Sequence, residues 1–139
     1  MERGSFDRTI RSDISEIPEI STRLETMMQA NGFPDEDILD TQLAVEEAIT
    51  NIIMHGYREV NGAITISCHS GTGVMEIRLE DRAPPFDPLS LPEPDLDGDI
   101  EERKIGGLGI FLIRRVMDEI RYRYEDGKNI LILTKRKKA

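Results

Sequence analysis

The chain has 139 residues and a formal net charge of −9, from 27 acidic and 18 basic side chains. That length suits one domain, residues 1–139, with a sizeable hydrophobic core. The acidic balance argues against direct binding to nucleic acid, which requires a positive surface. The single cysteine, Cys68, excludes an internal disulfide and a cysteine-based metal site.

Neither end of the sequence carries a targeting or binding signal that we recognise. Residues 1–9 lack the apolar segment of a secretory signal, and no run of about 18 apolar residues occurs. We therefore expect a cytoplasmic protein that does not associate with a membrane. We interpret the basic cluster at 135–138 as a solubilising end rather than a binding surface.

The first part of the chain predicts a strand followed by two helices. Residues 6–10 favour a short strand. Apolar residues at helical spacing then predict a helix from about residue 15 that ends at Gly32. A second helix is predicted from the acidic residues 35–37, which suit the positive end of a helix, to His55.

The middle of the chain predicts two strands and a long loop. Apolar and polar residues alternate over 63–69 and 74–81, with a glycine-rich turn between them. Cys68 lies on the apolar side of its strand, which favours a buried structural thiol. Residues 82–104 break the pattern and contain five prolines. A loop of that length inside a compact domain is usually functional or disordered.

The last part predicts a helix and a hairpin. The glycine-rich run 106–109 leads into an amphipathic helix, and two strands, 121–125 and 129–135, flank an Asp-Gly turn. The hairpins predict mostly antiparallel pairing, and the helices must bury their apolar faces on the sheet. We therefore expect an α+β sandwich with the helices on one face.

The second helix carries Glu47, Asn51 and His55 at successive steps of four residues, so they are neighbours on one face. A polar stripe on an otherwise apolar helix must be solvated, hydrogen-bonded or bound to a ligand. Asn51 offers an oxygen suited to a Mg²⁺ ion that bridges phosphates. Glu47 could accept a proton from an attacking hydroxyl or water. Considered alone, the pair also fits an ordinary solvated helix face.

Two further segments have a functional and an ordinary interpretation. Asp81 ends an apolar strand, so we expect it to be partly buried and to need donors. The exocyclic amine of adenine is such a donor, whereas the carbonyl of guanine would be repelled; alternatively, Asp81 caps its own turn. The run 106–109 could bring backbone N–H groups against phosphate, or could be a flexible turn. It does not match a P-loop.

Together, the helix asparagine, the strand-end aspartate, the long loop and the glycine-rich helix start resemble the GHKL ATPases of the gyrase, Hsp90, histidine kinase and MutL type. The chain is most similar to their small bacterial anti-sigma factor serine/threonine kinases, of the SpoIIAB and RsbW kind. Residues 47–57 match the N-box, 81–88 the adenine box and 106–110 the second glycine box. The resemblance covers roughly residues 17–135. No phosphoacceptor histidine box precedes the domain, which argues against a histidine kinase.

The resemblance implies a Bergerat ATP-binding fold, with ATP and Mg²⁺ as cofactors. Asn51 would ligate Mg²⁺, Glu47 would be the general base, and Asp81 would hydrogen-bond adenine. The segment at about 84–105 would be the ATP lid. The other nucleotide-binding residues that the resemblance implies are Ala83, Phe86, Gly106, Gly107, Leu108 and Gly109.

One position departs from the family pattern. The adenine box usually reads Asp-x-Gly, whereas Ala83 stands in place of the glycine. Alanine resists positive φ, so we expect the backbone beside the base to follow a different path while Asp81 keeps its role. We expect His55 to be structural.

The resemblance also implies a function: transfer of phosphate from ATP to a serine of a STAS-domain anti-anti-sigma partner. Many members also hold a sigma factor, usually as homodimers. Two alternatives are a noncatalytic nucleotide-dependent module that sequesters its partner, and a degenerate scaffold that binds no nucleotide. The intact Glu47 argues against the noncatalytic module.

Overall fold

The computed structural model describes residues 4–57, 61–85, 87–90 and 108–138. Every helix and strand expected from the sequence is present in the expected order. The elements are β1 (Gly4–Arg11), a 3₁₀ turn (Ile14–Glu16), α1 (Ile17–Ala30), α2 (Asp35–Asn51), a π-helical segment η2 (Ile52–Tyr57), β2 (Ala63–Gly71), β3 (Val74–Asp81), a 3₁₀ turn (Pro88–Ser90), α4 (Leu108–Val116), β4 (Glu119–Glu125) and β5 (Lys128–Arg136).

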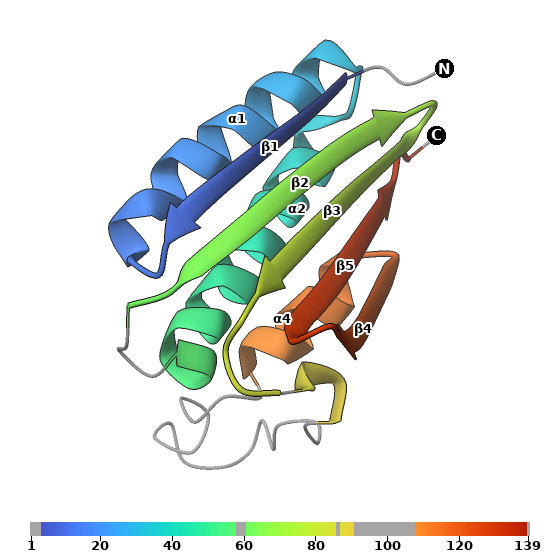
Figure 1. Ribbon diagram of the computed structural model, residues 1–139. Helices are drawn as coiled ribbons and strands as arrows, with labels where there is room; N and C mark the ends of the chain where they lie inside the picture. The colour runs from blue at the N-terminus through green and yellow to red at the C-terminus, as the bar shows by residue number, and fades with distance from the viewer. Residues whose placement is uncertain (1–3, 58–60, 86, 91–107, 139) are drawn as a thin grey trace.

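The strands form one antiparallel sheet in the order β1-β2-β3-β5-β4, and the three α-helices cover one of its faces (Figure 1). This arrangement confirms the predicted α+β sandwich. Alternation along β2 and β3 sends every second side chain into the core between the two layers. Its fully buried members include Ile20, Leu24, Ile49, Ile64, Ile66, Ile77, Leu79, Ile113 and Leu133.

Cys68 lies in this core with no exposed surface, as its position in the alternating run predicted. Burial raises the pKa of its thiol to about 12, and the nearby Asp7 adds a smaller effect in the same direction. The thiol therefore stays protonated at neutral pH and acts as a small apolar side chain.

The second helix reaches Tyr57, but it changes form after Asn51. Its last six residues, Ile52–Tyr57, are π-helical, so their turn is wider than that of an α-helix. The hydroxyl of Tyr57 donates to the carbonyl of Ala63 at 2.7 Å and accepts from the backbone N–H of Arg82 at 2.9 Å. These contacts hold the wider turn against the start of β2 and the end of β3. His55 lies within this π-helical segment, whereas Glu47 and Asn51 lie in the regular α-helix before it.

The hairpin between β4 and β5 confirms the predicted Asp-Gly turn. Asp126 and Gly127 both have positive φ, 53° and 77°, as the central residues of a type I′ turn require. The tight turn sets the register of β5, which pairs Asn129 with Tyr124 of β4 on one side and with Asp81 of β3 on the other. Asp81 and Asn129 therefore face each other where β3 ends and β5 begins.

The basic cluster at 135–138 has an intramolecular role that the sequence interpretation did not include. Lys135 is 4% exposed, and its Nζ lies 3.1 Å from Oδ2 of Asp40 and 2.5 Å from the carbonyl oxygen of Val116. Lys138 bonds Glu36 through its Nζ at 2.8 Å. These contacts join the end of β5 to the first turns of α2 and to the end of α4.

The buried ion pair gives a prediction about stability. We expect Asp40→Ala to lower the free energy of unfolding by about 3 kcal/mol, because it leaves a buried ammonium without its counter-charge. Lys135→Met should cost about 1 kcal/mol or less, because it keeps the apolar stem and leaves Asp40 partly hydrated. Urea unfolding of both variants measures the difference, and equal losses would contradict the asymmetry.

Candidate functional site

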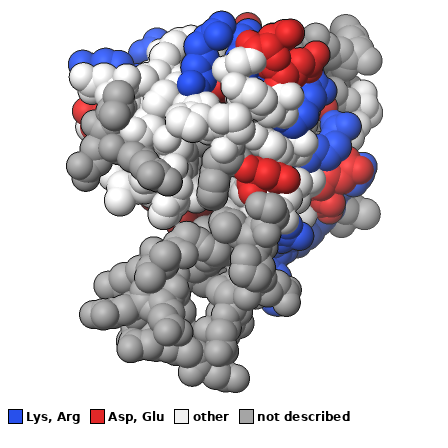
Figure 2. Space-filling view, turned by 60° about the horizontal axis from the view of Figure 1, so that its bottom comes forward, with Lys and Arg blue, Asp and Glu red and all other residues white. Residues whose placement is uncertain are grey.

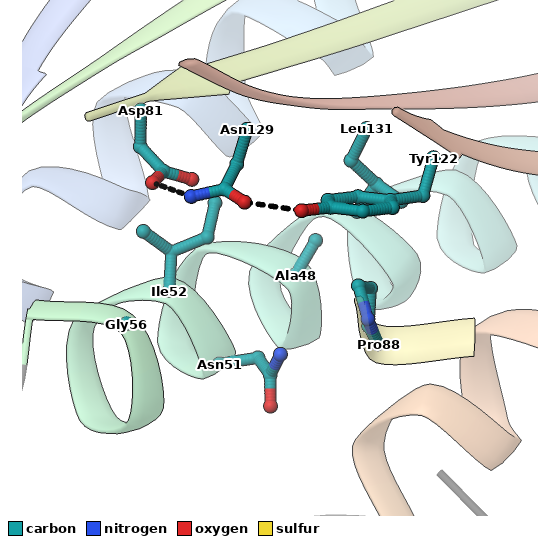
Figure 3. Close-up of a pocket in the computed structure, with 9 residues that line it drawn as sticks. All are labelled: Ala48, Asn51, Ile52, Gly56, Asp81, Pro88, Tyr122, Asn129 and Leu131. Carbon is teal, nitrogen blue, oxygen red and sulfur yellow. Dashed lines mark hydrogen bonds between the residues drawn. The ribbon is translucent and has the colours of Figure 1, made fainter. Parts of the chain in front are cut away.

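A pocket opens at the end of the molecule where β3 ends and β5 begins (Figure 3). It is partly open to solvent and has a cavity volume of about 20 Å³. One wall comes from α2 and η2, and the other from the sheet. Its lining residues are Ala48, Asn51, Ile52, Gly56, Asp81, Pro88, Tyr122, Asn129 and Leu131.

The inner end of the pocket holds a hydrogen-bonded group on three strands. Oδ1 of Asp81 accepts from Nδ2 of Asn129 and from the backbone N–H of Ala83, each at 2.9 Å. The same Nδ2 also donates to the carbonyl oxygen of Ala83 at 3.0 Å. The hydroxyl of Tyr122 donates to Oδ1 of Asn129 (Figure 3). Asp81 and Asn129 are each 6% exposed, so this polar group is buried.

The Asp81 carboxylate divides its two oxygens between different environments. The hydrogen bonds from Asn129 and Ala83 both use Oδ1, and no described residue hydrogen-bonds to Oδ2. Burial raises the pKa of Asp81, and the hydrogen bonds from Asn129 and Ala83 oppose that effect. Asp81 therefore caps its own turn through Oδ1, as one of the two interpretations of the sequence predicted, while its contact with adenine stays a prediction.

Ala83 fits the turn without left-handed strain. Asp126 is the one non-glycine residue with positive φ in the described part of the chain, so Ala83 does not need the conformation that glycine favours. Ala83 is 3% exposed and is not among the residues that line the pocket. Instead, a Cβ built on Gly56 would lie 3.2 Å from the Cβ of Ala83, so the methyl group packs where Gly56 has no side chain.

The polar side chain that α2 contributes to the pocket is that of Asn51. Asn51 is half-buried, and its amide points away from the Asp81–Asn129 pair (Figure 3). Glu47, one turn earlier, is also half-buried, whereas Glu46 is exposed. A Cβ on Gly109 would come within 2.9 Å of Oε2 of Glu47, so this carboxylate lies against the first turn of α4. Burial raises the pKa of Glu47, and the charge of Glu46 raises it further.

Several predicted site residues cannot be placed. Phe86, Gly106 and Gly107 lie outside the described residues, as does most of the predicted lid at 84–105. Leu108 begins α4, but its side chain is outside the description. Within the first residues of the predicted lid, Leu89 accepts a hydrogen bond at 2.8 Å through its carbonyl oxygen from Nη2 of Arg114, which ties the 3₁₀ turn to α4.

The sequence analysis missed Asn129 and Tyr122. Neither belongs to a recognisable motif, and each lies in an ordinary alternating strand. The Asp-Gly turn could have helped to find them, because it sets the register between the last two strands. Finding the partner of Asp81 also required knowing that β3 lies beside β5.

Figure 2 shows the charged side chains on one face of the part of the chain that the structure describes. Basic and acidic side chains are interspersed over the described part of this face (Figure 2). The described residues contain no group of three or more His, Cys, Asp or Glu side chains that could hold a metal ion. None of the described helices combines the length and apolar character needed to cross a bilayer.

The fold and the pocket define a nucleotide-binding class, and comparison with known proteins identifies it. Residues 10–135 match the family model of the histidine kinase-like ATPase domain. The RsbU and RsbW domains of a Mycobacterium tuberculosis protein share the fold, with a TM-score of 0.67 at 20% identity over 96% of this chain and 32% of that chain.

Individual relatives of known activity identify the group within this family to which the chain is similar. The chain is 36% identical over 106 residues to the serine-protein kinase RsbW of Listeria innocua, covering 73% of this chain and 68% of that protein. It is 35% identical over 105 residues to the serine-protein kinase RsbW of Bacillus cereus, covering 73% of this chain and 66% of that protein. The chain belongs to the histidine kinase-like ATPase family and, within it, to the RsbW-like serine-protein kinases.

The close approach of Gly56 and Ala83 gives a prediction about packing. We expect Gly56→Ala to destabilise the protein by about 1–2 kcal/mol, because two methyl groups would meet at 3.2 Å. Ala83→Gly in the same chain should recover part of that loss. A double-mutant cycle from thermal or urea unfolding measures the coupling. Strictly additive effects would show that the two positions do not touch.

Proposed function

We propose that this chain is an ATP-dependent kinase that phosphorylates a serine of a STAS-domain anti-anti-sigma partner and acts as an anti-sigma factor in partner switching. The observation that carries the proposal is the half-buried Glu47 carboxylate, one turn before Asn51 and beside a pocket that holds Asp81. The names of the Listeria and Bacillus relatives support the same activity. The sigma factor and a homodimeric state are further predictions of the family resemblance.

The inner end of the pocket suits adenine. Ile52 and Leu131 supply apolar surface for a flat base. Asp81 is 6% exposed, and its Oδ2 has no donor among the described residues, so this oxygen can accept a hydrogen bond from a ligand. The exocyclic amine of adenine supplies that donor, whereas the carbonyl of guanine would meet the carboxylate with a second acceptor.

The mouth of the pocket suits the phosphates with their metal ion. Mg²⁺ usually keeps several waters and takes few protein ligands while it bridges phosphates, so a single amide oxygen is sufficient. Asn51 is the residue of α2 that lines the pocket with a side-chain oxygen, and it would provide this ligand. When bound, Mg²⁺ would neutralise part of the phosphate charge.

Glu47 would act as the general base. As the serine oxygen forms its bond to the γ-phosphorus and the bond to ADP breaks, the hydroxyl proton would pass to the Glu47 carboxylate. Partial burial raises the pKa of Glu47, which makes the carboxylate a better proton acceptor. Positioning of the reacting groups and electrostatic stabilisation would supply the rest of the rate enhancement.

Transfer of labelled phosphate to purified STAS-domain partners tests the proposal. We expect Glu47→Gln to bind ATP normally by calorimetry and to lose transfer by about 100-fold or more. Asn51→Ala should lose ATP binding in the presence of Mg²⁺. Glu46→Gln is the matched control: Glu46 is the exposed neighbour on the same helix, and its charge raises the pKa of Glu47 less than burial does, so activity should fall far less than in Glu47→Gln.

Two outcomes would overturn this assignment. Full transfer by Glu47→Gln would exclude a base role for that carboxylate. ATP binding by the unmodified chain with no transfer to any partner tested, but with nucleotide-dependent partner binding, would replace the kinase with a sequestering module.

The contact between Gly109 and Glu47 gives a separate prediction. We expect Gly109→Ala to lower kcat by about tenfold or more, because the added methyl group would displace the Glu47 carboxylate from 2.9 Å away. Stability should not fall, because alanine is favoured over glycine in a helix by about 1 kcal/mol. Gly71→Ala, where no atom lies within 4 Å of the new Cβ, is the control. Unchanged kcat in Gly109→Ala would contradict the predicted coupling.

A further inference from the structure

We infer that Asn129 and Tyr122 are positioning residues that set the purine selectivity of the pocket, because together they commit one oxygen of Asp81 to the protein and leave the other as an acceptor for the base. This inference rests on the proposed nucleotide site. It concerns two residues that contribute no recognisable motif to the sequence. It is carried by the hydrogen bonds among three neighbouring strands.

The orientation of the Asn129 amide is fixed by its surroundings. Three oxygen atoms face Nδ2: Oδ1 of Asp81 at 2.9 Å, the carbonyl oxygen of Ala83 at 3.0 Å and that of Pro84 at 3.3 Å. If the amide were turned over, its oxygen would face all three acceptors with no hydrogen between them. The arrangement therefore requires Nδ2 on this side and Oδ1 on the other.

Tyr122 completes this constraint from β4. Because Oδ1 of Asn129 is an acceptor, the Tyr122 hydroxyl must be the donor in the bond between them. A half-buried phenol at this point therefore opposes rotation of the amide. Tyr122 therefore donates a hydrogen bond to Asn129, and Asn129 donates one to Asp81.

This order decides what Asp81 can recognise. A buried carboxyl group tends to take up a proton, and a protonated carboxyl can donate to the carbonyl of a six-oxo purine. Donors from Asn129 and Ala83 favour the ionised form instead. An ionised Asp81 offers Oδ2 only as an acceptor, so it selects the six-amino group of adenine over the six-carbonyl group of hypoxanthine or guanine.

The strand register is what places the Asn129 amide beside the Asp81 carboxylate. Asp81 and Asn129 are paired residues of β3 and β5. The Asn129 amide bonds Asp81 at the end of β3, and it also bonds the carbonyl oxygens of Ala83 and Pro84 in the turn that follows. Removing the amide therefore loosens the Asp81 carboxylate and the path of residues 83–84 at the same time.

Calorimetric binding of ADP and IDP tests the inference, because the two nucleotides differ at the six position of the base and neither needs a protein partner. We expect the unmodified chain to prefer ADP. In Asn129→Ala the ratio of the two dissociation constants should fall by about tenfold. Tyr122→Phe, which removes one hydroxyl group, should lower the same ratio by about threefold.

Tyr124→Phe is the matched control. Tyr124 lies on the same strand two residues further on and is 47% exposed, so its substitution should leave both affinities unchanged. Loss of affinity for ADP and IDP by one common factor would indicate a merely structural role and would overturn the inference. If Asn129→Ala does not fold, as judged by circular dichroism, Tyr122→Phe alone decides, and an unchanged ratio there overturns it.

The outcome separates this inference from the proposed function. Unmodified protein that fails to bind ADP would refute the nucleotide site itself, and with it both proposals. Protein that binds ADP with the same selectivity in Asn129→Ala and Tyr122→Phe would refute only the role of these two residues.

Discussion

A carboxylate buried at the end of a central strand must find donors, and the way Asp81 finds them organises this end of the molecule. One donor comes from its own turn and the other from Asn129, which the pairing of β3 with β5 places directly opposite. Satisfying one oxygen from the protein leaves the other for a ligand, in a pocket with apolar walls. Shifting β5 by one residue would turn Asn129 to the opposite face of the sheet and leave Asp81 without its second donor.

Hydrogen bonds and an ion pair to the strands hold the helix that carries Glu47 and Asn51 in place on the sheet. The π-helical turn after Asn51 brings Tyr57 to hydrogen-bond at the start of β2 and just beyond β3. At the other end of α2, Lys135 joins β5 to Asp40 and to the last turn of α4. The helix that carries Glu47 is thus held at both ends, which limits how far the proposed base can move relative to the pocket.

Ala83 stands where the family pattern has glycine, and the structure shows how the turn accommodates it. Sequence reasoning expected a different backbone path because alanine resists positive φ. In agreement with that expectation, Ala83 does not adopt positive φ, and its methyl group lies beside Gly56, a residue of a different element. The hydrogen bond from the backbone N–H of residue 83 to Asp81 is therefore present with alanine at this position, where the neighbouring Gly56 leaves room for the methyl group.

The sequence by itself determined the order of helices and strands, the sandwich class, the buried position of Cys68 and the family motifs that contain Glu47, Asn51 and Asp81. These features depend on periodicity and on local turn chemistry, which neighbouring residues specify. Tertiary structure alone decided that Asn129 and Tyr122 meet Asp81, that Gly109 lies against Glu47, and that the basic end is tied to α2. Those contacts join residues far apart in the chain, so they depend on strand order and helix packing, which local sequence patterns do not encode.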